Sequence, residues 1–137
     1  MTINPKPIAG GVLFTDENMK VTAFHNLHLG EPVDGIWKSF MFLIEAKGKR
    51  IVYSGDIKEI AELERVIGFG CDILLPETGH HHYLDVCKFM NGKNVKNLFF
   101  THVGRSILKD PVKALIDAQN HFDGNVLICS DGTSFDL

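Results

Sequence analysis

Three stretches of this sequence place a metal-binding type of side chain at the end of an apolar run. The candidates are His25 and His28 after residues 20–24, Asp56 after residues 51–55, and His102 after residues 97–101. Imidazole nitrogens and carboxylate oxygens are ligands of zinc and of comparable first-row metals. One carboxylate can bridge two cations, so an aspartate flanked by two histidines is half of a dinuclear site, in which a bound water becomes acidic enough to attack an electrophile. The alternative is a set of solvated loop residues and a capping aspartate.

Three further side chains follow later strand ends and are candidates for supporting roles. Glu77 could orient a metal-bound histidine, and otherwise is a plain loop carboxylate. His80, in the run of three histidines at 80–82, could act as a catalytic proton donor or phosphate contact, or be solvated. Arg105 could bind a substrate phosphate, the alternative being a surface loop position.

The elements that must position these residues can be predicted from composition and periodicity. Strands rich in β-branched and aromatic residues are predicted at 12–14, 20–25, 39–46, 51–53, 72–75, 97–100 and 125–129, and Asp131-Gly132 predicts a turn into a closing strand at 133–135. Apolar residues at helical spacing predict helices at 58–67, 83–90 and 111–121. Residues 1–11 are predicted to be an extended lead-in and residues 29–38 a loop, because both contain several glycines and prolines.

The order of these elements predicts an α/β fold with one mixed sheet. The short turn at Lys47 to Lys49 predicts an antiparallel hairpin, whereas the second half alternates helices with strands. The strands of that second half are apolar on consecutive residues, which indicates that both of their faces are covered. About three helices can cover one face. The folded-over hairpin, a second sheet or another chain must cover the other.

Length and composition indicate one domain over residues 1–137 and exclude some classes of protein. The net charge of −3 and the pI near 6.1 lack the basic footprint of a dedicated nucleic-acid binder, so nucleic acid enters only as a possible substrate. The odd number of widely spaced cysteines, Cys71, Cys87 and Cys129, favours small buried thiols in a reducing compartment. No apolar run approaches the roughly 20 residues of a membrane span, and residues 1–10 lack a signal-peptide core. We therefore expect a cytoplasmic protein with no membrane association.

Several motifs together resemble the second half of metallo-β-lactamase-fold hydrolases, and especially their ribonuclease Z-like and phosphodiesterase branch. The motifs are residues 20–28, the hairpin of residues 42–56 ending in Ser-Gly-Asp, Leu-Leu-Pro-Glu-Thr at 74–78, Leu-Phe-Phe-Thr-His at 98–102, and Ser-Asp-Gly at 130–132. The resemblance implies the C-terminal half of an αββα sandwich. The missing second sheet would then cover the face that the helices leave bare.

The same resemblance implies a role for each candidate ligand. In the family, the Ser-Gly-Asp aspartate bridges two metal ions, the Thr-His histidine binds one ion, and a histidine ahead of the hairpin binds the other. Those positions correspond to Asp56, His102 and His28, with His25 as the alternative to His28. The implied cofactor is a pair of divalent ions, zinc first, with manganese or iron as alternatives. The family's His-x-His-x-Asp-His loop is absent, so most of the ligands must come from residues outside this sequence.

Two functions follow as expectations. The first is hydrolysis of phosphodiester or other ester bonds by a metal-bound hydroxide, once the missing N-terminal half completes the site. On this interpretation the isolated chain is inactive or binds one metal weakly. The second is a non-catalytic half-domain whose role is association. On either interpretation we expect the bare sheet face to be buried in a homo-oligomer or against an N-terminal half-domain, because its exposed area would exceed a tolerable apolar patch.

Overall fold

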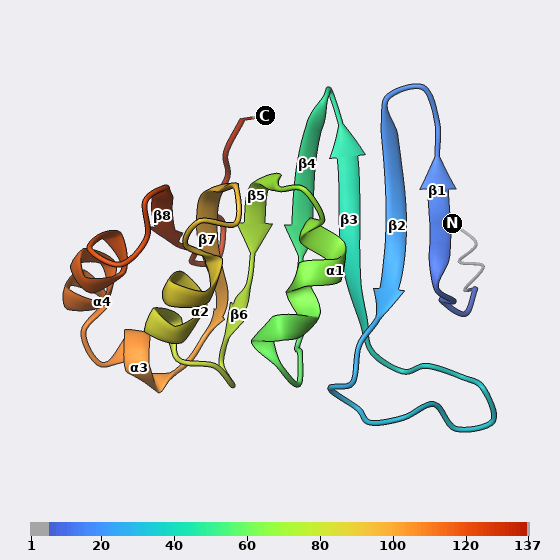
Figure 1. The fold of residues 1–137 in the computed structure, drawn as a ribbon, viewed down its shortest axis with the longest axis horizontal. Helices are drawn as coiled ribbons and strands as arrows, with labels where there is room; N and C mark the ends of the chain where they lie inside the picture. The colour runs from blue at the N-terminus through green and yellow to red at the C-terminus, as the bar shows by residue number, and fades with distance from the viewer. Residues whose placement is uncertain (1–5, 137) are drawn as a thin grey trace.

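The structure is a computed structural model that describes residues 6–136. The strands are β1 (Gly11–Thr15), β2 (Met19–His25), β3 (Phe40–Ala46), β4 (Lys49–Tyr53), β5 (Cys71–Leu75), β6 (Glu77–Thr78), β7 (Val95–Val103) and β8 (Asn125–Ile128). The helices are a 3-10 turn η1 (Ile60–Leu63), followed by α1 (Glu64–Ile67), α2 (Tyr83–Met90), α3 (Arg105–Leu108) and α4 (Pro111–Gln119) (Figure 1).

The eight strands form one mixed sheet, in which the hydrogen-bonded neighbours follow the order β1-β2-β3-β4-β5-β7-β6. Strand β8 lies off this path and also pairs with β7. Strands β1 to β4 pair antiparallel as a meander, and the remaining pairings, from β4–β5 onward, are parallel. The predicted α/β class with one mixed sheet is therefore confirmed. The parallel part matters for function, because the carboxyl ends of such strands meet at one edge.

The predicted hairpin is present as β3 and β4. Ala46 pairs with Lys49 across a two-residue turn, in which Lys47 and Gly48 have φ values of 50° and 71°. Positive φ at both central residues is the twist that matches two antiparallel strands. The hairpin fixes the register of β4, and so the point at which its last residues leave the sheet.

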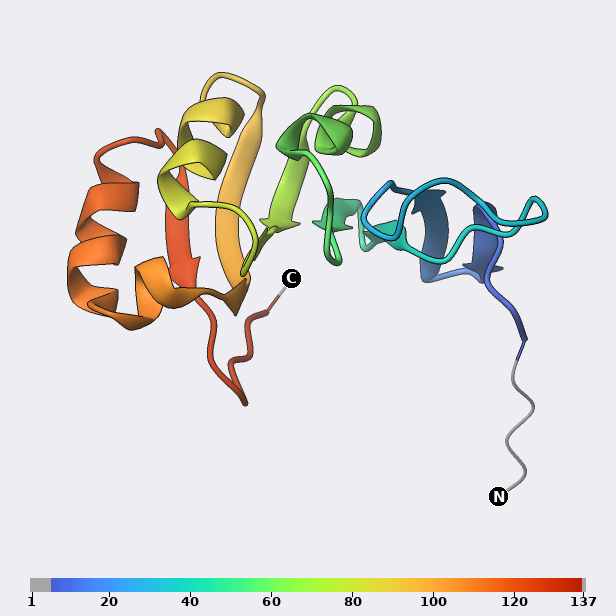
Figure 2. The ribbon, with the colours of Figure 1, turned by 90° about the horizontal axis from the view of Figure 1, so that it is seen from below.

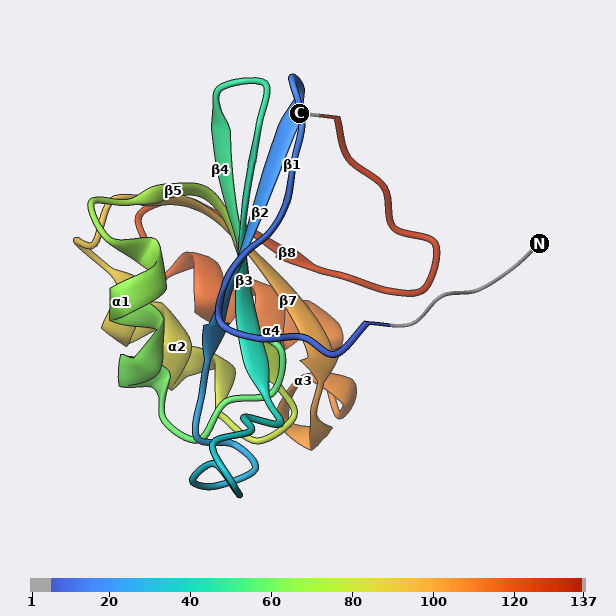
Figure 3. The same cartoon turned by 90° about the vertical axis from the view of Figure 1, so that its right-hand side faces the viewer.

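Four α-helices and the 3-10 turn pack on one face of the sheet, one helix more than expected (Figures 2 and 3). The core lies between this face and the helices, and contains strand residues such as Val52, Leu74 and Phe100 together with Leu63 and Val86 of the helices. The predicted helix at 58–67 is split into η1 and α1, and α4 ends two residues before the predicted boundary.

The opposite sheet face is only partly covered. Tyr53 is 42% exposed on this face, where its ring stacks on that of Phe42. The segment after β8 leaves the sheet on this side (Figure 2), and the ring of Phe135 lies 4.9 Å from that of Phe99. That a further layer covers this face stays a prediction.

The predicted closing strand at 133–135 is wrong for the described chain. The Asp131-Gly132 turn is present, with Thr133 N–H donating to the Ser130 carbonyl at 3.0 Å, but the residues after it pair with no strand of the sheet. A strand requires a neighbouring ladder, and the adjacent sheet face presents only side chains to this segment.

Two remaining expectations concern the ends of the chain and its helices. Residues 1–5 of the predicted lead-in lie outside the described residues, residues 6–10 contain no helix or strand, and β1 already begins at Gly11. Among residues 6–136, no helix is long and apolar enough to cross a membrane.

Candidate metal centre

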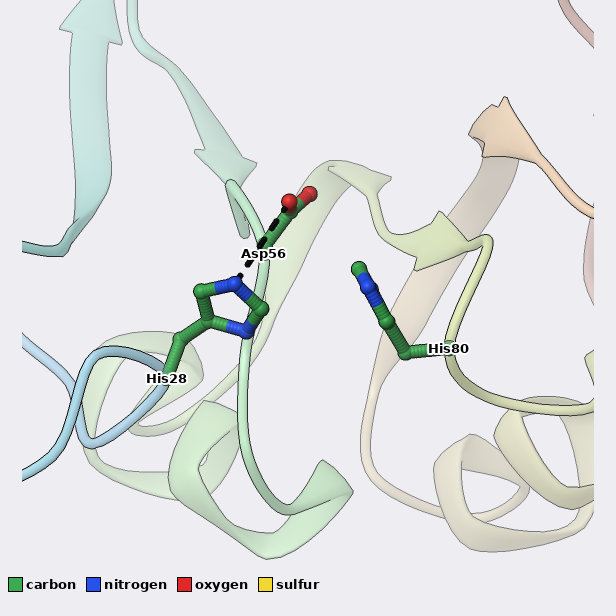
Figure 4. Close-up of side chains that lie close together, drawn as sticks. All are labelled: His28, Asp56 and His80. Carbon is green, nitrogen blue, oxygen red and sulfur yellow. Dashed lines mark ion pairs between the residues drawn. The ribbon is translucent and has the colours of Figure 1, made fainter.

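The candidate residues meet at one edge of the sheet because the strands that carry them run in the same direction. β2 and β4 flank the oppositely directed β3, so the carboxyl ends of β2 and β4 lie at the same edge as those of the parallel β5 and β7. His28 follows β2, Asp56 follows β4, and His80 follows β6 (Figure 4). The sequence predicted His102 after the end of its strand. In the structure β7 is longer, and His102 lies one residue before its end.

The turn before Asp56 is fixed by Ser54 and Gly55, the two residues that precede it. Ser54 is fully buried, and its hydroxyl accepts a hydrogen bond from Glu77 N–H at 2.8 Å, which ties the end of β4 to the start of β6. Gly55 has φ 54°, and a Cβ atom there would lie 2.8 Å from the Phe40 carbonyl oxygen. The sharp turn therefore requires glycine, and it points the Asp56 side chain out of the sheet edge.

A buried asparagine joins the His28 segment to the Asp56 turn. The side-chain amide of Asn26 donates to the Asp56 carbonyl at 3.0 Å, and its oxygen accepts from His28 N–H at 3.0 Å. Asn26 is fully buried, so these bonds are shielded from water. Sequence reasoning missed this residue, although its place between two histidines was a usable signal.

The Asp56 carboxylate faces two imidazoles with its two oxygens. Oδ1 lies 2.7 Å from Nδ1 of His102, a hydrogen bond in which the imidazole donates. Oδ2 lies 3.8 Å from Nε2 of His28 (Figure 4). The three side chains that the sequence singled out as metal ligands are therefore neighbours in space, although 74 positions separate the first from the last.

His80 enters the same cluster from the loop after β6. Its ring centroid lies 5.0 Å from that of His28 and 5.3 Å from that of His102. One ligand atom from each of His28, Asp56 and His80 lies within 4.8 Å of the others, and the same is true of Glu77, His80 and His102. The donor set, imidazoles with carboxylates, suits a divalent first-row metal.

Glu77 is the buried anchor of this loop. Only 1% of its side chain is exposed, and its Oε2 accepts the His80 backbone N–H at 2.9 Å. Its Oε1 lies 3.3 Å from His80 Nδ1 and 3.6 Å from His81 Nε2. Glu77 therefore contacts two histidines of its own loop, and the orienting of a metal-bound histidine by Glu77 stays a prediction.

His102 has an unusual backbone for its place in the sheet. Its φ is 43°, and among the described residues it is the one non-glycine residue with positive φ that lies within a strand. Its ring packs against Gly79, where a Cβ atom would approach His102 Nε2 to 2.9 Å. Glycine at 79 thus leaves space for the imidazole beside Asp56.

Comparison with known proteins gives a fold but no close relative. No family model matches the chain, and no curated protein matches it. Among solved structures, the metallo-β-lactamase fold protein YhfI from Bacillus subtilis is similar with a TM-score of 0.61 at 17% identity, covering 88% of this chain and 50% of its own. The protein described here has the architecture of half a metallo-β-lactamase fold.

Two further metallo-β-lactamase structures support this fold. Tm1679, a metal-dependent hydrolase of the β-lactamase superfamily, is similar with a TM-score of 0.61 at 14% identity, covering 96% of this chain and 58% of its own. The superfamily protein tm0207 from Thermotoga maritima is similar with a TM-score of 0.58 at 17% identity, and the match covers 88% of this chain and 69% of tm0207. The chain spans 50% of YhfI and 58% of Tm1679.

His25, the alternative ligand, lies apart from the cluster in this half metallo-β-lactamase fold. Its ring stacks on Trp37 with centroids 3.9 Å apart, and its Nε2 lies 3.4 Å from Nη1 of Arg65. The geometry therefore favours His28 as the residue opposite Asp56. His25 instead lines a cleft with Trp37, Glu31 and Arg65.

Arg105 lies beside the cluster and begins α3, a short helix that sequence reasoning missed. Together with Ser106 it lines a cleft of about 480 Å³ that also contains His80 and His102. A guanidinium there is placed to bind an anionic group of a ligand.

A larger and mostly apolar groove of about 840 Å³ begins at His102. It runs between β8 and the helices α3 and α4, and its walls include Leu108, Val112, Leu115 and Leu127. His102 therefore lines both this groove and the cleft that contains Arg105.

Proposed function

We propose that the chain is the C-terminal half of a metal-dependent hydrolase that cleaves phosphodiester or other ester bonds. One observation carries this proposal: His28 and His102, from two separate strand ends, face the two oxygens of the Asp56 carboxylate at the carboxyl edge of the sheet. The fold shared with metal-dependent hydrolases supports it.

The proposed roles follow from the positions of the side chains. His28, Asp56 and His102 would hold two divalent ions, zinc first, with Asp56 shared between them and one histidine for each ion. A metal in such a site supplies Lewis acidity, which polarises the ester and acidifies water. His80 donates a proton to the leaving group, and Arg105 binds a phosphate oxygen. Where the substrate is a carboxylic ester, the groove at His102 holds its apolar part.

The proposed partner is an N-terminal half-domain that covers the bare sheet face and supplies the remaining ligands. Two observations support this choice: the partly exposed Tyr53 on that face, and the fraction of the two first neighbours that the chain spans. A homo-oligomer that buries the same face is the alternative, and it goes with the second candidate function, a non-catalytic half-domain. Nucleic acid fits the proposal as a phosphodiester substrate.

The test is metal-dependent hydrolysis by the completed site. The chain is co-expressed with the polypeptide that carries a His-x-His-x-Asp-His loop, encoded in the adjoining reading frame or in a companion gene. The complex is assayed on bis(4-nitrophenyl) phosphate and 4-nitrophenyl acetate. We expect hydrolysis that a chelator abolishes and zinc or manganese restores, and that Asp56→Asn removes.

A matched control separates loss of the site from loss of charge. Asp72→Asn makes the same change on β5, in a carboxylate that binds Lys96 Nζ at 2.7 Å, away from the cluster. This variant should keep the activity. Hydrolysis by Asp56→Asn at the wild-type rate, or the absence of any polypeptide with the required loop, would overturn the proposed function.

A further inference from the structure

We propose that this chain binds one divalent metal ion by itself, through His28, Asp56 and His80, before any other polypeptide completes the site. The inference rests on the proposed function for two of its ligands, His28 and Asp56. It adds His80 as the third, a residue to which the proposed hydrolase gives another role.

The three donors already have nearly the spacing that one ion requires. Two atoms that bind the same metal at roughly 2.0 to 2.2 Å lie roughly 3 to 3.5 Å apart. His28 Nε2 and Asp56 Oδ2 are separated by 3.8 Å, and all three donor atoms lie within 4.8 Å of one another. Rotation of partly exposed side chains closes the remaining gap.

Glu77 selects the nitrogen that His80 would offer. Its buried carboxylate accepts the His80 backbone N–H at 2.9 Å and lies 3.3 Å from Nδ1 of the same residue. When Nδ1–H donates to Glu77, the proton is absent from Nε2, whose lone pair becomes free. A carboxylate that fixes the tautomer in this way is typical of metal-binding histidines and raises their basicity.

His102 occupies the other side of the carboxylate and leaves room for this ion. Its Nδ1 hydrogen-bonds Asp56 Oδ1 at 2.7 Å, which orients the carboxylate and leaves Oδ2 toward His28. Two histidines and one carboxylate then form a three-ligand site with open positions. These positions would accept ligands from a companion half, at which point His80 is released for proton donation.

The consequence is an order of assembly. The lone chain carries the first metal to the companion half, and the companion supplies the ligands that complete the site. Metal loading of this half therefore does not depend on its partner.

The experiment measures metal binding rather than hydrolysis. The metal-free chain, without a polyhistidine tag, is titrated with zinc by calorimetry and with cobalt by absorption spectroscopy. We expect one equivalent bound, with the cobalt bands of a site containing imidazole. We expect Glu77→Gln to weaken binding about 10- to 100-fold and His80→Gln to weaken it further.

Controls separate ligation from folding and from nonspecific histidine binding. His121→Gln changes a histidine at the end of α4, whose Nδ1 lies 2.7 Å from the Asp117 carbonyl oxygen, and should leave zinc affinity unchanged. Thermal unfolding of each metal-free variant reports whether it folds. His80 is half-exposed, so its variant should fold even where the variant of the buried Glu77 does not.

The outcomes distinguish this inference from the proposed function. Wild-type zinc affinity in His80→Gln, together with loss of binding in Asp56→Asn or His102→Gln, would overturn the role of His80 while leaving the proposed hydrolase intact. No stoichiometric binding by the wild-type chain would also overturn the inference. One zinc bound by the lone chain in dependence on His80, together with a completed complex that hydrolyses nothing, would support the inference and overturn the hydrolase.

Discussion

At the scale of single residues, three histidines gather around the Asp56 carboxylate, two from loops and His102 from the end of strand β7. Asp56 is positioned by a glycine turn and by the buried side chains of Ser54 and Asn26. The second carboxylate, Glu77, is buried and contacts the His80 loop. The cluster therefore has an exposed layer of donors and a buried layer that orients them, as metal sites usually do.

The cysteines give a residue-scale prediction with a defined pH dependence. Burial raises the pKa of Cys71 to about 12 and that of Cys87 to about 11. Both thiols stay protonated at pH 8, and only the thiolate reacts with alkylating agents. We expect iodoacetamide at pH 8 to modify Cys129 alone, slowly because partial burial raises its pKa too. Mass spectrometry of tryptic peptides identifies the modified residue.

In this experiment, denaturant should expose all three thiols, and Cys129→Ser should abolish labelling of the native protein. Modification of Cys71 or Cys87 in the native protein at the rate of Cys129 would contradict the prediction.

The meeting of the candidate ligands at one edge of the sheet could be predicted from the sequence, because their positions follow the strands. An apolar run that ends in His or Asp places that side chain at the sheet edge, whatever the details of the loop. The partners of Glu77 could not be predicted from the sequence, because they depend on the backbone path of residues 77–81. The left-handed backbone of His102 likewise depends on packing against Gly79, which no local pattern indicates.

At the scale of elements, helix termini decide which boundaries the sequence could predict. The bounds of α2 match the prediction, since Asn91-Gly92 marks its end. α3 was missed because its four residues are too few to show a helical period. The strand predicted at 133–135 is absent because local composition predicts strand propensity but cannot supply a neighbouring strand.

The start of α4 gives an element-scale prediction. The Asp110 carboxylate caps the helix by accepting the Lys113 backbone N–H at 3.0 Å, and Pro111 occupies the first turn. We expect Asp110→Ala to lower the free energy of unfolding by about 1 kcal/mol, because one N–H of the first turn loses its partner. Urea unfolding followed by circular dichroism measures this change.

Asp110→Asn is the matched control and should keep most of the stability, because asparagine caps helices equally well. Equal destabilisation by alanine and asparagine would show that the charge of Asp110, rather than its capping bond, stabilises α4.

At the scale of the whole molecule, the sheet has a helical layer on one side and little on the other. This asymmetry could be predicted because three strands are apolar on consecutive residues while the helices are too few to cover both faces. The covering element could not be predicted, because an apolar strand pattern indicates that a face is covered but not which surface covers it.

The bare face gives a prediction about association. We expect the isolated chain to bind the dye ANS and to sediment as species larger than the monomer as concentration rises, because an exposed apolar face favours contact. Tyr53→Lys, on this face at the end of β4, should reduce both signals. Fluorescence titration and sedimentation velocity measure them.

Phe69→Lys is the matched control, because Phe69 is 97% exposed in the loop between α1 and β5 and lies away from this face. A monodisperse monomer without dye binding would contradict the prediction. So would an equal effect of the two substitutions.

The backbone of His102 implies a conflict between stability and chemistry. A non-glycine residue at φ 43° pays a steric penalty of roughly 1 to 2 kcal/mol that glycine avoids. His102→Gly should therefore unfold at higher urea than His102→Ala, by up to about 1 kcal/mol after the entropy of glycine in the unfolded chain is counted. Both variants lose the imidazole beside Asp56. If glycine is the more stable variant, the strained backbone at position 102 of β7 is the cost of placing an imidazole nitrogen beside Asp56.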